Sequence, residues 1–87
     1  MDLEELRNGI ALIDRKVMEL VSERTSLAEK IGEIKHSRGM PVKDPGVEAK
    51  VVARYRNYAE EAGLEPDEGE RLARLLIDIA IRKETQR

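Results

Sequence analysis

Cysteine, phenylalanine and tryptophan are absent from this 87-residue sequence, and Tyr55 and Tyr58 are its two aromatic residues. Without cysteine the chain has no disulfide, no zinc–thiolate site and no thiol nucleophile. Two tyrosines are too few to build a surface on which nucleic-acid bases stack. The net charge is −2 with both signs interspersed, so the basic stripe of a nucleic-acid-binding protein is also missing.

Apolar runs of membrane-spanning length are missing as well, and residues 1–5 are too acidic for a targeting peptide. No histidine–carboxylate cluster indicates a metal, no serine–histidine–aspartate set indicates a catalytic triad, and no glycine-rich loop indicates a nucleotide. We therefore expect a soluble, cytoplasmic protein of one small domain, residues 1–87, that uses no metal or other cofactor. Its charged residues, 39% of the chain, are left to carry the function.

Proline is rare, and none interrupts residues 3–37, where apolar residues recur at alternating steps of three and four. The recurring positions are Leu3, Leu6, Ile10, Ile13, Val17, Leu20, Leu27, Ile31 and Ile34. Arg24 is the one member of this series that is not apolar. Asp2 and Glu5 form a capping-box-like start, and Pro41 lies beyond the end. The pattern predicts a single helix over residues 3–37.

A helix of this length is about 50 Å long, whereas a compact domain of this size has a radius of gyration of about 12 Å. The remaining residues are too few to cover the apolar series along such a rod. A sustained three–four series is typical of a helix that packs on a partner helix, most simply a copy of itself. The sequence therefore predicts an intertwined helical homodimer.

Two shorter helices follow, so the predicted fold class is all-α with three helices per chain. Asp44 and Pro45 provide an N-cap and a proline at the first helical position of a helix over residues 45–62. Pro66 opens a third helix over residues 66–85. The side chains expected to face inward on the second helix are Val47, Val51, Val52, Tyr55 and Ala59. Those expected on the third, which would make that helix largely enclosed, are Leu72, Leu75, Leu76, Ile77, Ile79 and Ile81.

Arg24 is the most unusual charged residue, because a buried cation without a partner is costly. Its partner is either an internal carboxylate, Asp78 or Glu48, or the carboxylate of a ligand. Lys35 lies three turns further along the helix, so both side chains point the same way, about 16 Å apart. Arg7 lies about 25 Å from Arg24 and about 100° around the axis, so only an antiparallel partner chain brings the two together. Taken singly, Lys35 and Arg7 are more simply explained as solvated cations.

Four other polar residues are candidates with simpler explanations beside them. Glu48 either accepts a hydrogen bond from a ligand hydroxyl or is a surface carboxylate favoured by the helix dipole. Glu84 falls in the last turn of the third helix, where a negative charge opposes the dipole, which hints at protonation or a cationic partner. Asp44 is explained as an N-cap, and His36 as an exposed residue at a helix end.

The candidate charges recur with definite neighbours along the chain. The segments are Leu6-Arg7, Ile13-Asp14, Glu23-Arg24, Leu27-Ala28, Lys35, Pro41-Val42-Lys43-Asp44-Pro45 and Glu48. This arrangement resembles the all-helical chorismate mutases, over essentially the whole chain. Single segments are weak signals, whereas two arginines, a lysine, an aspartate and a glutamate at these spacings are fairly specific.

The resemblance implies an enzyme, an isomerase, that carries out the Claisen rearrangement of chorismate to prephenate in phenylalanine and tyrosine biosynthesis. It also implies two cofactor-free sites in an intertwined homodimer. By position, Arg7 would reach into the partner's site and Arg24 would bind within its own. Each would hold a carboxylate of the substrate.

The resemblance also assigns the rest of the site. Lys35 would contact the ether oxygen of the substrate, as would Glu84, at a position that the family fills with Gln or Glu. Glu48, helped by the Asp44 region, would hold the ring hydroxyl. Such a rearrangement needs a folded substrate conformer and stabilisation of the charge on the ether oxygen, and no nucleophile or metal.

Two positions depart from the family pattern. Val47 stands where the family usually has an arginine directly before the glutamate of the second helix, and Lys43, Lys50 and Arg54 are the candidates to replace it. Ala80 stands where some relatives carry a serine that touches the ring carboxylate.

Two alternatives stay open on the sequence. The missing arginine allows an isochorismate–pyruvate lyase on the same scaffold, although the pair Asp44 and Glu48 favours the mutase. The second alternative is a non-catalytic helical dimerisation module, or a regulator that binds a metabolite without turnover. Arg24 argues against a dimerisation module, because such a module gains nothing from an arginine in its apolar series.

Overall fold

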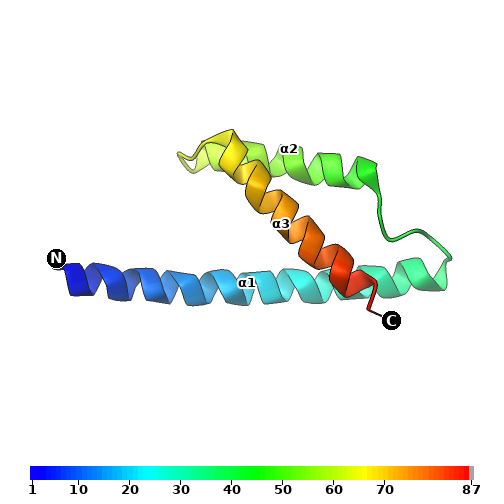
Figure 1. The fold of residues 1–87 in the computed structure, drawn as a ribbon, viewed down its shortest axis with the longest axis horizontal. Coiled ribbons are helices and arrows are strands. Elements are labelled where there is room, and N and C mark those ends of the chain that lie inside the picture. The colour runs from blue at the N-terminus through cyan, green and yellow to red at the C-terminus, as the bar shows by residue number, and fades with distance from the viewer. Residues whose placement is uncertain (87) are drawn as a thin grey trace.

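The computed structural model describes residues 1–86, which form three α-helices and no strand. The helices are α1 (Leu3–Ser37), α2 (Pro45–Glu61) and α3 (Pro66–Glu84), in the arrangement of Figure 1. The all-α prediction with one very long helix is confirmed. Helices α2 and α3 each end one residue before the predicted range, because Ala62 and Thr85 occupy the C-cap positions.

Short-range polar contacts fix the ends of the helices. The Asp2 carboxylate accepts a hydrogen bond from the Glu5 N–H at 2.8 Å, which caps α1. The Asp44 carboxylate accepts from the N–H groups of Gly46 and Val47 at 3.1 and 3.2 Å, which caps α2. Gly39 has a φ of 65°, so a residue without a side chain makes the left-handed turn that follows α1.

Helix α3 joins the other two helices. It packs on both α1 and α2, whereas α1 and α2 do not pack directly on each other within the described residues. Figure 1 shows α3 running obliquely from the far end of α2 down to the C-terminal half of α1. The chain measures 55 × 25 × 14 Å, with a radius of gyration of 15.9 Å. It is therefore more extended than a compact domain of this length, for which about 12 Å is expected.

The core is small and lies between α2 and α3. Val51, Val52, Ala73 and Ile77 form a buried cluster, against which Tyr55 and Ile81 pack. At the far end of α2, Arg56 bonds to Asp67 at 2.8 Å and to Glu70 at 2.9 Å. These hydrogen bonds raise the pKa of the Arg56 guanidinium above its ordinary value.

Two expectations about burial are wrong in the single chain. The Val47 side chain is exposed at the start of α2, and Leu72 and Leu75 of α3 are exposed as well. The third helix is therefore not enclosed: it uses its face with Ala73, Leu76 and Ile77 to contact α1 and α2. Periodicity identifies the apolar faces of a helix. Where a helix has two such faces, periodicity does not show which of them packs against the rest of the same chain.

Helix α1 contacts α3 through small residues near its C-terminal end. Ala28 and Gly32 are the buried residues of α1. A Cβ atom on Gly32 would lie 2.9 Å from the Glu84 Cα, so the two helices approach closely there. The apolar series of α1 is left uncovered, at 48 to 63% exposure for Leu3, Leu6, Ile10, Ile13, Val17, Leu20, Leu27, Ile31 and Ile34. None of the helices in residues 1–86 is long and apolar enough to cross a membrane.

Candidate active site

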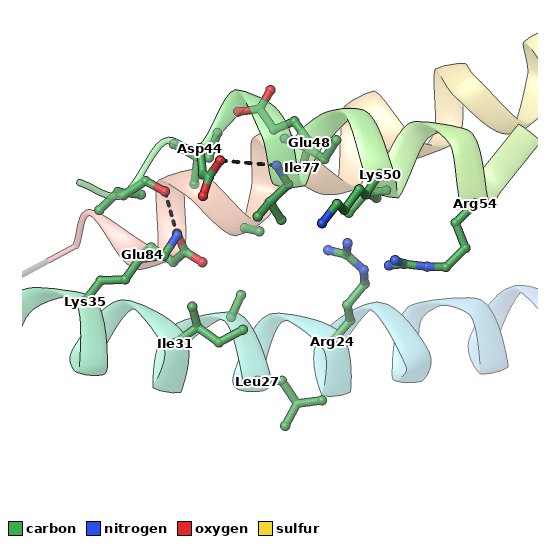
Figure 2. Close-up of a pocket in the computed structure, with 16 residues that line it drawn as sticks. Arg24, Leu27, Ile31, Lys35, Asp44, Glu48, Lys50, Arg54, Ile77 and Glu84 are labelled. Atoms are coloured by element: carbon green, nitrogen blue, oxygen red, sulfur yellow. Dashed lines mark hydrogen bonds and ion pairs between the residues drawn. The ribbon is translucent and has the colours of Figure 1, made fainter. Parts of the chain in front are cut away.

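A groove of about 380 Å³ lies between α1 and α2, with α3 as its floor. Its charged lining residues are Arg24 and Lys35 from α1, Asp44, Glu48, Lys50 and Arg54 from the start and length of α2, and Glu84 from α3. Apolar side chains, among them Ile31 and Ile77, lie between these charges (Figure 2). The gap exists because α1 and α2 are held apart by the helix that both contact.

One end of the groove holds a buried ion pair between α1 and α3. The Lys35 ammonium lies 3.8 Å from the Glu84 carboxylate, and the two side chains are only 19% and 9% exposed. Lys35 also donates a hydrogen bond of 2.8 Å to the carbonyl oxygen of Val42. Since an ammonium has three N–H donors, this arrangement leaves Lys35 able to donate to a ligand oxygen. The cationic partner that the position of Glu84 suggested is Lys35.

Arg24 enters the groove at the end opposite Lys35 (Figure 2), and no carboxylate of residues 1–86 forms an ion pair with it. Its guanidinium donates a long hydrogen bond of 3.4 Å to the Leu76 carbonyl oxygen. Among the described ion pairs, Asp78 binds Arg82 at 2.9 Å instead, and no pair joins Arg24 to Glu48. The interpretation of Arg24 as half of an ion pair with Asp78 or Glu48 is therefore wrong. Its charge remains available to an anion in the groove.

The two acidic residues of α2 differ in their contacts. The Asp44 carboxylate caps α2, as its position in the sequence predicted. Glu48 is half-buried, and its Oε2 atom is enclosed without a hydrogen-bond partner in residues 1–86. Figure 2 shows the Glu48 carboxylate turned away from Arg24, so it needs a side-chain rotation to meet a ligand between α1 and α2. A buried oxygen without a partner favours binding of a hydrogen-bond donor.

Two of the sequence candidates lie outside the groove. Arg7 lies in the exposed N-terminal half of α1 and His36 in its last turn, and neither lines the cavity. The two positions that depart from the family pattern do line it: Val47 on the α2 wall and Ala80 on the floor. Lys43, a candidate to replace the missing arginine, does not line the groove either, so a single chain brings together the other candidate charges without Arg7 and Lys43.

Sequence reasoning gave little weight to three contributors to this site. From the sequence, Lys50 and Arg54 are expected only as possible replacements for the arginine that Val47 displaces. Both line the groove, and both point toward Arg24 in Figure 2. They follow Val47 by three and seven residues, so they lie on the same face of the helix as Val47. This spacing is the feature of the sequence that could have placed them in the site. The Val42 carbonyl that holds Lys35 is a backbone group, for which the sequence carries no signal.

The arrangement is suited to binding a small anion with oxygen atoms at more than one position. Cations lie on α1 and α2, while the carboxylates of Asp44, Glu48 and Glu84 lie toward the end that holds Lys35 (Figure 2). No group of three metal-ligating side chains is found in the part of the chain that the structure describes. Charged groups held in place by folded helices can orient a substrate and stabilise charge that develops in it.

Comparison with known proteins gives one family over nearly the full chain. Residues 6–85 match the family model for chorismate mutase type II. A chorismate mutase of Methanocaldococcus jannaschii is 36% identical over 76 residues, which cover 87% of this chain and 77% of that protein.

Two longer proteins are similar over part of their length. The T-protein of Haemophilus influenzae is 34% identical over 65 residues, which cover 75% of this chain and 17% of that protein. A bifunctional chorismate mutase/prephenate dehydratase of Aquifex aeolicus is 35% identical over 69 residues, which cover 77% of this chain and 19% of that protein. This chain therefore spans less than a fifth of the length of these two relatives.

Proposed function

The chain belongs to the type II chorismate mutase family, and we propose that it converts chorismate to prephenate in the groove between α1, α2 and α3. One observation carries the assignment of the reaction to this groove. Arg24 and Lys35, three turns apart on α1, enter one cavity together with Glu84 of α3. This is the set of charges that the family resemblance assigns to substrate carboxylates and to the ether oxygen.

Lys35 and Glu84 are proposed to act at the ether oxygen. The rearrangement is unimolecular: a C–O bond breaks while a C–C bond forms, and negative charge develops on the oxygen. The Lys35 ammonium, held by the Val42 carbonyl, is placed to stabilise that charge without reorganising during the reaction. Glu84 lies within 4 Å of Lys35 and can donate a second hydrogen bond when it carries a proton.

The other charged residues are proposed to fix the substrate in its reactive conformation. Arg24 binds a carboxylate, since a guanidinium matches a carboxylate with two parallel hydrogen bonds. Glu48, whose Oε2 lacks a partner, accepts a hydrogen bond from the ring hydroxyl after turning into the groove, with the Asp44 region beside it. Holding the folded conformer removes an entropic part of the barrier.

The direct test is to follow the loss of chorismate by ultraviolet absorbance with purified protein and to identify the product. Prephenate is the expected product, and heating or acid treatment that converts prephenate to phenylpyruvate provides an independent check. Release of pyruvate from isochorismate would instead support the lyase alternative. Binding of chorismate without any product would support the non-catalytic alternative.

We further propose that the protein works as an intertwined homodimer in the cytoplasm, with the partner's Arg7 completing each groove. The support is the apolar series of α1, which its own chain leaves exposed over nine positions. Burying that series against a second α1 removes apolar surface from water, and an antiparallel arrangement brings Arg7 of one chain toward Arg24 of the other.

Mixing two inactive variants tests the shared site. Arg7→Ala and Arg24→Ala chains are each expected to be nearly inactive alone. In an equal mixture that has been unfolded and refolded together, half of the dimers are mixed and each holds one intact site. About a quarter of the wild-type activity should therefore return. No recovery from two variants that each dimerise normally would show that Arg7 does not act across the interface.

A further inference from the structure

Three cations gather at the end of the groove opposite Lys35. Arg24 of α1 and Lys50 and Arg54 of α2 all line the cavity. Figure 2 shows the Lys50 ammonium and the Arg54 guanidinium pointing from α2 toward the guanidinium of Arg24, across the gap between the helices. We call these three residues the cationic cluster.

Helix geometry explains how Lys50 and Arg54 reach the same point. They lie three and seven residues beyond Val47, about 4.5 and 10.5 Å along the α2 axis. Side chains on an α-helix lean toward its N-terminus, so both long side chains extend back toward the part of the wall where Val47 lies. Val47 itself offers the groove a short apolar side chain without a donor. The donors on this wall therefore come from Lys50 and Arg54.

The cationic cluster has no counter-ion among residues 1–86. Within residues 1–86, the described ion pairs of α2 and α3 arginines involve Arg56, Arg74 and Arg82, each bound to a carboxylate of α3. No described ion pair or hydrogen bond involves Lys50 or Arg54, and Arg24 has only its long bond to the Leu76 carbonyl. Three like charges that converge on one point repel one another, and a bound anion relieves this repulsion.

We propose that Lys50 and Arg54 are additional substrate-binding residues, which with Arg24 form a subsite for one carboxylate of the substrate. This inference rests on the proposed function and deepens it. All three residues of the subsite come from one chain, whereas Arg7 is proposed to come from the partner chain. The subsite takes a doubly negative substrate with one carboxylate in the cationic cluster and the reacting oxygen at Lys35. Lys50 and Arg54 bind the substrate before and during the reaction alike, so their loss acts on KM rather than on kcat.

Steady-state kinetics of four proteins test the proposal: the wild type, Lys50→Ala, Arg54→Ala and the double variant. We expect KM for chorismate to rise about tenfold in each single variant and further in the double variant, with kcat changed less than about threefold. The matched control is Arg71→Ala, which removes the same charge from an exposed position of α3 outside the groove. Its KM should equal that of the wild type.

A second readout separates binding from structure. Raising the salt concentration screens the attraction between the cationic cluster and the substrate, so KM should rise more steeply for the wild type than for the double variant. Arg54→Lys, which keeps the charge but loses the fork of donors, should restore part of the affinity. If the double alanine variant does not fold by circular dichroism, Lys50→Met with Arg54→Gln repeats the test with the apolar stems retained.

The outcomes distinguish this inference from the proposed function. A wild type that forms no prephenate overturns the proposed function. A wild type that forms prephenate, with the same KM in the double variant or with a loss confined to kcat, overturns the subsite while leaving the proposed function intact. A KM increase equal to that of Arg71→Ala likewise overturns it, because the effect is then one of overall charge.

Discussion

Lys35 extends along the end of α1 to the carbonyl of Val42, and this hydrogen bond determines where its ammonium lies. The sequence predicted that Lys35 and Arg24 share a direction, because their spacing is close to three whole turns. It also identified Glu84 as an acid in an unfavourable place. It could not reveal that the loop between α1 and α2 turns back far enough to supply the carbonyl, because loop geometry depends on long-range packing rather than on periodicity.

Replacing Lys35 removes the group closest to the proposed developing charge. We expect Lys35→Ala to lower kcat about 100- to 1000-fold, as when one donor of an oxyanion hole is removed. Steady-state rates at saturating chorismate measure this effect, and Lys30→Ala, on an exposed part of α1 outside the groove, is the control. Unchanged turnover in Lys35→Ala would remove Lys35 from the mechanism.

Glu84 lies beside Lys35 and is proposed to contribute a hydrogen bond to the ether oxygen. We expect Glu84→Gln, which places an N–H donor at the same position, to keep kcat within about threefold of the wild type, and Glu84→Ala, which has no donor, to lower kcat about 100-fold. Steady-state kinetics at saturating chorismate measure both values. Glu61→Gln, which changes an exposed carboxylate at the end of α2, serves as the control. Equal kcat in Glu84→Ala and the wild type would contradict a donor role for Glu84.

Helix α1 shows why periodicity alone does not predict which of its faces contacts α3. In its C-terminal half, the small buried residues Ala28 and Gly32 face α3, while the larger Leu27 and Ile31 remain exposed beside them. The sequence identified the larger apolar series but not the face of small residues. Alanine and glycine carry little hydrophobic signal, yet they allow two helices to approach closely. The same limitation explains the wrong expectation that α3 would be enclosed.

Gly32 is where this close approach meets the active site. A methyl group there would meet the backbone and side chain of Glu84 at 2.9 to 3.1 Å. We expect Gly32→Ala to lower the free energy of unfolding by about 1–3 kcal/mol and to reduce kcat, because the end of α3 that carries Glu84 must move. Denaturant unfolding and steady-state kinetics measure the two effects. Equal stability and activity of Gly32→Ala and wild type would show that α3 accommodates the methyl group freely.

Gly9 provides the matched substitution on the same helix. Apart from its chain neighbours and the nearby backbone of α1 itself, no atom of residues 1–86 lies within 4 Å of a Cβ placed there. Gly9→Ala should therefore raise the helix stability by about 0.5–1 kcal/mol. A loss of stability instead would indicate that a partner helix passes over Gly9.

The elongated shape agrees with the sequence argument that a rod of this length exceeds what its own chain can cover. The chain is 55 Å long, and the N-terminal half of its longest helix carries an uncovered apolar series. The three-helix architecture followed from caps, prolines and periodicity. The association of two chains remains a prediction, because it depends on contacts between two molecules rather than within one.

A charge in the apolar series should prevent the proposed association. Ile13→Glu is expected to shift the sedimentation of the protein from dimer to monomer and to lower its Tm, since the series is stabilised only by a partner. Leu12→Glu, an equally exposed position outside the three–four series, should remain dimeric. A wild type that sediments as a monomer, or a dimer that tolerates Ile13→Glu, would contradict the homodimer.

Because α1 and α2 meet only through α3, the width of the groove depends on residues that no substrate touches. Ala73, which has no exposed surface, and Gly69, where a Cβ would collide with the carbonyl of Tyr55, determine how closely α3 approaches α2. Slightly larger side chains at such points would change the spacing of the walls while leaving Arg24 and Lys35 in place. Libraries built at these positions therefore offer a route to variants that accept bulkier ring systems with the reactive groups unaltered.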